Sequence, residues 1–427
     1  MSRKVIFIAL FLFFILAKNA FCAGSGAFRL EVPDAAAMGK GSAFVAQADN
    51  PSAVYYNPAG LTQLKGNTYF SAGVGVVQPF TKYKDNSGNE TQMQRQVFEI
   101  PHGYVVSDFG LKKFAFGIGA GSFWGLGTQW ANDSFSKTVA TKTDLNSQTI
   151  MLTTAYEIND NISVGASADY TAASVDMHRQ TVPEVGGGDF QVKGKDNNAW
   201  GYRLSALYKL NMRHSFGLMY RSATQIKYKG ELYLNGNTLS IPGIGSVFGS
   251  SYSTSVISNS TLPRSVVFGY CFKPTDKWRF EADMEWMDWA STKSTSYDYP
   301  DEKNPARLNL LNIGVNPTFE RNWHSVFSYS CGTEYKINDT WKLRAGYFYH
   351  KTPIAQANFE TSLPDASANS VTFGVGYAIN KNLNFDFAYA AMFFDPRKVT
   401  NNVGSSGING TYHSFDNIYM ATVTFKI

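Results

Sequence analysis

Charge is scarce in this chain. Charged residues make up 17% of its 427 residues, whereas soluble domains average about 25%. Aromatic residues are abundant instead, at 15%. A water-soluble protein of this size needs a more highly charged surface, so the composition favours a protein that turns apolar side chains towards a membrane.

Long apolar runs are absent beyond the amino terminus. Residues 1–22 combine a basic start, one apolar run and small residues at the end, which is the pattern of a secretory signal peptide. The run is too short for a membrane helix, which needs about 20 residues, and no second run follows. Removing Arg3, Lys4 and Lys18 with this signal peptide from the 38 basic residues leaves 35, against 33 acidic ones. This nearly equal number of basic and acidic residues does not indicate nucleic-acid binding.

Cysteine is scarce as well, at 3 residues. A lipid anchor on Cys22 is an alternative to simple cleavage, but the bulky Phe21 before it disfavours that reading. A disulfide between Cys271 and Cys331 is chemically possible in an oxidising compartment. Because each lies in an apolar, strand-like run, we interpret both as small packing residues.

Catalytic and metal-binding motifs are also missing. The 6 histidines are scattered without the spacing of metal ligands, and no phosphate loop or nucleophile elbow is present. His324 and Ser328, four residues apart on a strand, would lie about 13 Å from each other. We therefore expect no enzyme activity, no cofactor and no metal.

Alternating apolar and polar residues fill the chain after residue 66, which predicts β-strands. One row of alternate positions is wholly apolar: Trp200, Tyr202, Leu204, Ala206, Tyr208 and Leu210. Repeated on every strand in water, such a row would aggregate, whereas in a bilayer it faces lipid. The fourteen predicted strands are 67–80, 96–107, 112–124, 144–158, 161–178, 197–211, 214–231, 259–273, 276–294, 322–337, 341–351, 370–380, 383–394 and 412–427.

The connections between these strands alternate between short polar turns and long loops, such as 230–258. This segregation is typical of outer-membrane barrels. We therefore expect an all-β fold, a transmembrane antiparallel barrel of about 14 strands spanning 67–427. The opposite face of strand 276–294 sends Glu281, Asp283 and Glu285 into the lumen. Paired carboxylates occur in glycosidases, but we interpret these as a ladder neutralised by basic residues on other strands.

Residues 23–66 are rich in small residues, nearly uncharged, and include YYNPAGLT at 55–62. The segment is too short to be a domain, and a fourteen-stranded barrel has more interior than its own side chains fill. We therefore expect an N-terminal hatch, or plug, inside the lumen.

A series of segments along the chain matches a known family in wording and in order. The segments are GAFRL (26–30), MGKG (38–41), YYNPAGL (55–61), FWGLGT (123–128), NAWGYRLSALYKL (198–210), MYRSATQIKYKG (219–230), LPRSVVFGY (262–270), WKLRAGYFYHKTPI (341–354) and SLPDASANSVTFGVGYAINKNL (362–383). They cover nearly the whole mature chain, and through them the chain resembles the FadL-type outer-membrane transporters of long-chain fatty acids and aromatic hydrocarbons.

The resemblance implies an apolar pocket near the amino end of the hatch and a side exit where the third strand kinks. Carried onto this chain, it implies substrate-binding residues at Phe28 and Leu30 and a hatch motif. The hatch motif is Asn57, Pro58 and Ala59. The lateral opening is Phe123, Trp124 and Gly125, of which the first two are bulkier than the family pattern. The outer loop 178–196 is short for a fatty acid transporter, so Leu239, Ile241 and Phe248 of the next long loop are expected to capture substrate.

We therefore expect passive uptake of hydrophobic compounds in the outer membrane of a Gram-negative cell. The expected partners are a hydrophobic small molecule and outer-membrane lipid, with the protein acting as a monomer. A nonspecific porin, an outer-membrane hydrolase and a surface adhesin are the alternatives. An open porin would lack the apolar segment 23–66.

Overall fold

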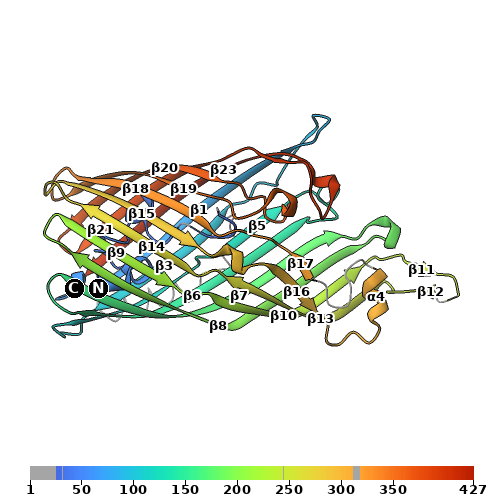
Figure 1. Ribbon diagram of the computed structural model, residues 1–427, viewed down its shortest axis with the longest axis horizontal. Helices are drawn as coiled ribbons and strands as arrows, with labels where there is room; N and C mark the ends of the chain where they lie inside the picture. The colour runs from blue at the N-terminus through green and yellow to red at the C-terminus, as the bar shows by residue number, and fades with distance from the viewer. Residues whose placement is uncertain (1–25, 31, 244, 311–317) are drawn as a thin grey trace.

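The computed structural model describes residues 26–30, 32–243, 245–310 and 318–427. Within these ranges the wall is one closed antiparallel barrel of fourteen strands, in which β23 returns to pair with β1 (Figure 1). The predicted signal peptide lies outside the described residues. In chain order the strands of the wall are β1 (Thr68–Lys84), β3 (Phe98–Ser107), β4 (Phe114–Gly121) with β5 (Gly125–Gln129), β6 (Lys142–Glu157), β7 (Ile162–Gln180), β8 (Asp189–Lys209), β9 (His214–Arg221) with β10 (Thr224–Asn235), β13 (Ser251–Leu262) with β14 (Ser265–Phe272), β15 (Trp278–Met287) with β16 (Ser294–Asp298), β17 (Thr318–Glu320) with β18 (Val326–Lys336), β19 (Trp341–His350), β20 (Ala368–Asn380), β21 (Leu383–Phe394) with β22 (Arg397–Val399), and β23 (Gly410–Lys426). Strand β2 (Glu90–Gln92) extends the hairpin of β1.

The structure confirms which face of the strands points outward. On β8, Trp200, Leu204 and Tyr208 are exposed, while Arg203 and Leu207 between them are buried. Side chains alternate across a strand, so one face of each strand must be lumenal when the other is exposed. The two faces differ in chemistry because only the inner one is buried against protein.

The loop expected at 230–258 is largely strand, which the sequence did not predict. β10 continues to Asn235 and pairs with β13 from Ser251 onward. The inward side chains of this extension pack into an apolar cluster, which explains why the strands continue beyond the wall. The cluster is formed by Phe190, Val192, Leu232, Leu234, Phe248, Val256, Tyr299 and Leu308. β11 (Ser240–Ile241), β12 (Gly245–Ser246) and α4 (Pro305–Leu310) project from this end, opposite the carboxyl terminus (Figure 1).

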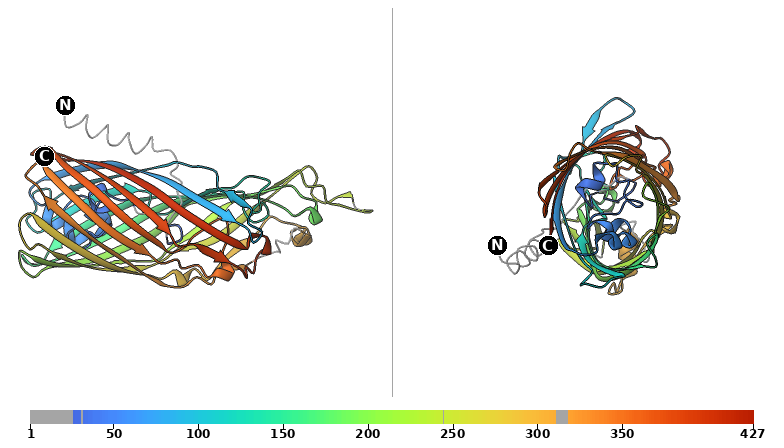
Figure 2. Two further views of the ribbon diagram at one scale, coloured as in Figure 1. Left: turned by 90° about the horizontal axis from the view of Figure 1, so that it is seen from above. Right: turned by 90° about the vertical axis from the view of Figure 1, so that its left-hand side faces the viewer.

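The N-terminal segment, residues 26–30 and 32–66, lies within the ring of strands (Figure 2, blue). It contains α2 (Ala35–Met38), α3 (Ala53–Tyr56) and η1 (Pro58–Leu64). Asp34 caps α2, its carboxylate accepting a hydrogen bond from the Ala37 amide at 3.0 Å. No helix in the described ranges is long and apolar enough to cross a bilayer.

The acidic ladder on β15 binds the N-terminal segment, in contrast to the expected neutralisation by other strands. Asp283 accepts hydrogen bonds from the amides of Phe44 and Val45, at 2.9 and 3.1 Å. Glu281 accepts from two further amides of the segment and pairs with the buried Lys40 at 3.2 Å. Carboxylates satisfy buried amides well, so the ladder fixes the segment to one side of the lumen.

Glycines in the wall let the backbone of this segment approach closely. A Cβ at Gly217 would lie 2.1 Å from the carbonyl oxygen of Val45, and one at Gly346 would lie 2.2 Å from the amide nitrogen of Gly41. Real Cβ atoms do not approach backbone this closely, so any side chain here would displace the segment. At these glycines the backbone of the segment therefore packs directly against the backbone of the wall strands.

Candidate functional site

The third pass of the wall is interrupted between β4 and β5. β4 pairs with β3 as far as Gly121, opposite His102. Among the described residues, β5 pairs with β6 and with no other strand. Residues 123–125 therefore have no neighbouring strand on the side that faces β3. Ser122, Phe123 and Trp124 join the two pieces, and we call this interruption the wall gap.

Residues 28–30 of the N-terminal segment fill the wall gap. The Leu30 amide donates to the Phe123 carbonyl at 3.1 Å, and the Gly125 amide donates to the Phe28 carbonyl at 2.9 Å. Arg29 and Trp124 form the bridge pair between them. On the side of residues 123–125 where a wall strand is missing, three residues of the N-terminal segment thus take its place.

A cluster of aromatic rings surrounds Phe28. Its ring lies 5.0 Å from Trp289, 5.9 Å from Trp124 and 6.1 Å from Trp323, centroid to centroid. The edge-to-face contacts with Trp289 and Trp124 are the favoured geometry for aromatic pairs. On the far side of the gap, Tyr55 of α3 packs on Phe123 at 4.3 Å. The gap is therefore closed by rings from both ends of the N-terminal segment.

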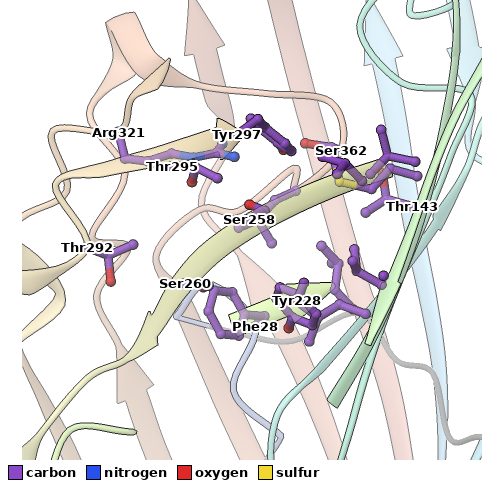
Figure 3. Close-up of a pocket in the computed structure, with 18 of the residues that line it drawn as sticks. Phe28, Thr143, Tyr228, Ser258, Ser260, Thr292, Thr295, Tyr297, Arg321 and Ser362 are labelled. Carbon is purple, nitrogen blue, oxygen red and sulfur yellow. Dashed lines mark hydrogen bonds between the residues drawn. The ribbon is translucent and has the colours of Figure 1, made fainter. Parts of the chain in front are cut away.

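Phe28 also lines a cavity of about 110 Å³ (Figure 3). We call this the Phe28 cavity. The lining of this cavity combines apolar side chains from several strands with hydroxyl groups from others. The lining residues are Phe28, Leu126, Thr143, Leu145, Val175, Met177, Val192, Lys193, Gly194, Tyr228, Val256, Ser258, Ser260, Thr292, Thr295, Tyr297, Arg321, Trp323, Ser362 and Leu363.

Arg321 is the guanidinium group at the edge of this cavity. It pairs with Glu360 at 2.6 Å and donates to the Thr295 hydroxyl at 3.1 Å. This cation is therefore already neutralised by a protein carboxylate, and Lys193, the other cationic residue that lines the cavity, is exposed. The apolar side chains and hydroxyl groups of the lining suit an apolar occupant with a few hydrogen-bonding groups.

The Asn-Pro-Ala motif lies at the opposite end of the N-terminal segment from Phe28. Asn57 is completely buried, and its side-chain amide donates to the carbonyls of Val45 and Ala206 at 2.7 and 3.2 Å. Its side-chain oxygen accepts from the Ala59 amide at 3.1 Å, which caps η1. Pro58 is the first residue of η1, where its missing N–H costs nothing. The motif joins the segment to β8.

The structure brings some predicted site residues together and separates others. Phe28 meets Trp124 at the gap, while Leu30 packs in a different apolar cluster with Val32. Leu239, Ile241 and Phe248 lie at the loop end of the barrel and do not line the Phe28 cavity. Their binding role stays a prediction.

Sequence reasoning missed Trp289, Tyr297, Arg321 and Trp323. All four come from the connection between the main parts of β15 and β18, which has no regular period. The aromatic residues there were visible, but nothing in the sequence indicated that they meet Phe28.

A family model described as "Outer membrane protein transport protein (OMPP1/FadL/TodX)" matches residues 16–426. The chain belongs to this family. It is accordingly an outer-membrane transport protein with a multi-pass barrel, as predicted.

Individual relatives of the family are distant but match over almost their full length. A long-chain fatty acid transport protein of Salmonella typhi is 24% identical, covering 92% of this chain and 93% of the relative. A Pseudomonas aeruginosa FadL homologue of known structure has a TM-score of 0.80 at 18% identity, covering 93% and 99% of the two chains. The toluene transporter TodX of Pseudomonas putida has a TM-score of 0.71 at 20% identity, covering 94% and 99%. These structural similarities show the shared barrel fold.

Proposed function

We propose that this protein carries hydrophobic compounds, long-chain fatty acids or aromatic hydrocarbons, passively across the outer membrane. The observation that carries the proposal is that Phe28 does two things at once. Its side chain lines an internal cavity, and its backbone closes the wall gap. A ligand that displaces the backbone of Phe28 together with its ring therefore also opens the barrel sideways. Relatives named as fatty acid and toluene transporters support the substrate range.

The size of the Phe28 cavity makes displacement necessary for a long substrate. A cavity of about 150 Å³ holds one benzene ring, and this one measures about 110 Å³. An alkyl chain fits only after the Phe28 ring moves out. Burial of the chain supplies about 25 cal/mol per Å² towards that movement. The substrate then leaves through the gap beside Gly125 into the membrane, down its concentration gradient.

Residues 23–66 act as the hatch, anchored by Asn57, Pro58 and Ala59. Leu239, Ile241 and Phe248 at the loop end catch apolar molecules before they enter. The protein works as a monomer in contact with lipid, and it performs no chemistry on its substrate.

A disulfide tether across the wall gap tests the proposal. Arg29 and Trp124 are a bridge pair, and Cα atoms paired in this way lie about 4.5–5.5 Å apart, which suits a disulfide. Arg29→Cys with Trp124→Cys, in a chain whose Cys271 and Cys331 are serine, holds residues 28–30 in the gap when oxidised. We expect oxidation to abolish uptake of labelled oleate or toluene by whole cells and reduction to restore it.

Matched controls separate the tether from the substitutions themselves. Each single cysteine variant should transport equally well with and without reductant. Uptake that continues through the oxidised double variant would contradict exit through the gap. Large steady currents of the wild type in planar bilayers would instead favour an open porin.

A further inference from the structure

A second interruption of the wall lies between β8 and the neighbouring strand formed by β9 and β10. From the short-turn end, β8 pairs with β9 as far as Arg203. It pairs with β10 only from Lys195 onward, towards the loop end. Within the described residues, the facing stretches 196–202 and 222–228 form no ladder with each other, although β8 stays paired with β7 and β10 with β13. We call these two stretches the β8–β10 seam.

Side chains replace backbone hydrogen bonds along this seam. The Ser222 hydroxyl accepts a hydrogen bond from the Tyr202 amide at 2.8 Å. The Asp196 carboxylate accepts one from the Lys227 amide at 2.7 Å. A ladder joins neighbouring strands by regular backbone bonds along its whole length. Separating β8 from β10 here therefore breaks a few contacts, whereas at laddered positions it breaks a continuous series of hydrogen bonds.

The seam has apolar side chains on both of its faces. On the inside, Ile226 and Tyr228 are buried in the same apolar cluster as Phe28. On the outside, Trp200 and Tyr202 are exposed, and aromatic residues of this kind flank the lipid-facing band of barrels. The seam runs from this aromatic end of the outward row towards the loop end. It therefore lies between the outer leaflet and the apolar interior.

The Phe28 cavity extends from the wall gap to this seam. Phe28 and Leu126 line it beside the gap, and Gly194 and Tyr228 line it at the seam. The side chains of Phe28 and Tyr228 both lie at the cavity in Figure 3. β6 and β7 form the wall between these two places. The cavity thus has an interruption of the wall on each side.

We infer that the β8–β10 seam is a second lateral opening, through which apolar molecules dissolved in the outer leaflet enter the Phe28 cavity. The inference rests on the proposed function and adds an entrance from lipid to the capture of substrate at the loop end. The class of compound that uses this entrance is the neutral long-chain hydrocarbon, which concentrates among acyl chains and is nearly absent from water. Entry at the seam and departure at the wall gap then use different interruptions of the same wall.

A disulfide across the seam tests the inference. A Cβ at Gly201 would lie 3.7 Å from the Cβ of Thr224, and disulfides join Cβ atoms about 3.5–4.5 Å apart. The Thr224 hydroxyl oxygen, which would lie 2.3 Å from the same Cβ, is removed by the substitution. Gly201→Cys with Thr224→Cys, in a chain whose Cys271 and Cys331 are serine, joins β8 to β10 when oxidised.

Photolabelling from the bilayer is the measurement. Full-length protein is placed in lipid nanodiscs that contain a hexadecane analogue with a diazirine at one end, and light-induced insertion is mapped by mass spectrometry. Such a chain is practically insoluble in water, so it reaches the cavity from lipid. In the wild type we expect insertion at Tyr228 and Val256, which line the cavity, and at the outward Leu204. Oxidation of the seam variant should abolish insertion at Tyr228 and Val256 and leave insertion at Leu204 unchanged, and reduction should restore the cavity labelling.

Two further tethers are the matched controls. Ala206→Cys with Leu218→Cys joins β8 to β9 at directly opposite positions where the strands are already laddered, so oxidation should leave cavity labelling unchanged. The oxidised tether across the wall gap, Arg29→Cys with Trp124→Cys, should also leave it unchanged, because that tether closes the exit and not the entrance.

The outcomes separate the seam from other routes. Cavity labelling that survives oxidation of the seam variant would overturn the inference. Loss of cavity labelling in the oxidised wall-gap tether would overturn it as well, because the probe would then enter through the gap. If the seam variant does not fold, as judged by heat-modified gel mobility, the wall-gap tether decides the question in the same way.

Whole-cell uptake reports on the proposed function independently. A wild type that takes up labelled oleate or toluene but shows no cavity labelling from the bilayer would overturn the seam as an entrance and leave the proposed function intact. A wild type that takes up neither compound would overturn the proposed function itself.

Discussion

Asp365 shows how a single residue couples a loop to the N-terminal segment. It lies in the connection between β19 and β20, is 2% exposed, and accepts a hydrogen bond from the Thr352 hydroxyl. Burial raises its pKa to about 7, although Thr352 and the nearby backbone amides of Ala27 and Gly26 act to lower the pKa. The carboxyl is therefore held beside the turn that leads into Phe28, and its charge is expected to change near neutral pH.

The sign of the pH effect follows from the direction of this pKa shift. A carboxyl whose pKa is raised on folding stabilises the folded state fully below its unfolded pKa of about 3.9, and this contribution is lost as pH rises through about 7. We expect hydrogen-exchange protection of the Ala27 and Phe28 amides to fall by at least about tenfold from pH 5 to pH 8, after correction for intrinsic rates.

Asp365→Asn is the matched control for this titration. The amide keeps the shape of the side chain but does not titrate, so protection in this variant should be independent of pH. An equal fall in wild type and variant would show that another group is responsible.

At the scale of elements, β18 and β19 act as a fitted surface for the N-terminal segment. A Cβ at Gly332 on β18 would lie 2.2 Å from the Lys40 carbonyl oxygen, and one at Gly346 on β19 would lie equally close to the Gly41 amide. Both glycines occupy inward positions of strands whose outward neighbours face away from the lumen. The inward glycines of these strands therefore leave the space that the backbone of the N-terminal segment occupies.

Gly346→Val is expected to unseat the segment while leaving the barrel folded. The new side chain occupies the place of backbone atoms, which cannot move aside as a flexible side chain can. The measurement is single-channel current in planar bilayers, which should change from closed in the wild type to steady conductance in the variant.

Gly407→Val provides the comparison for that experiment. Gly407 lies in a surface turn where the nearest atom to an added Cβ is 3.6 Å away, so its currents should match the wild type. Heat-modified gel mobility confirms that both barrels are folded. A Gly346→Val barrel that is folded but still closed would show that the segment adapts to the wall.

At the scale of the whole molecule, the sequence predicted the wall better than the interior. Each strand carries its own alternation, and the turn lengths segregate to two rims, so the number of strands and the outward row beginning at Trp200 could be predicted locally. Contacts in the lumen join residues far apart in the chain. Arg29 and Glu285 are separated by 256 residues, and no periodic signal links them.

The candidate site shows the same limit. Phe28 and the FWG sequence at 123–125 were expected on the basis of resemblance, whereas nothing in the sequence indicated that Trp289 and Trp323 contact Phe28. These contacts depend on how the interior of the barrel is assembled. The β10–β13 extension was likewise missed, because its apolar cluster forms only when four chain segments meet.

The outward row of β8 allows a test of the whole barrel in its membrane. Leu204 lies midway between Trp200 and Tyr208, both exposed, and aromatic residues of this kind flank the apolar band of barrels at both interfaces. Leu204→Arg places a charge near the bilayer centre, which costs about 2–4 kcal/mol. We expect reversible urea unfolding in lipid vesicles to show a loss of this size, whereas Met212→Arg, at a turn where the native side chain is 92% exposed, should change stability by less than about 0.5 kcal/mol. Equal effects of the two substitutions would contradict a lipid-facing position for Leu204, and with it the orientation of the strand row on which the inward position of Arg203 depends.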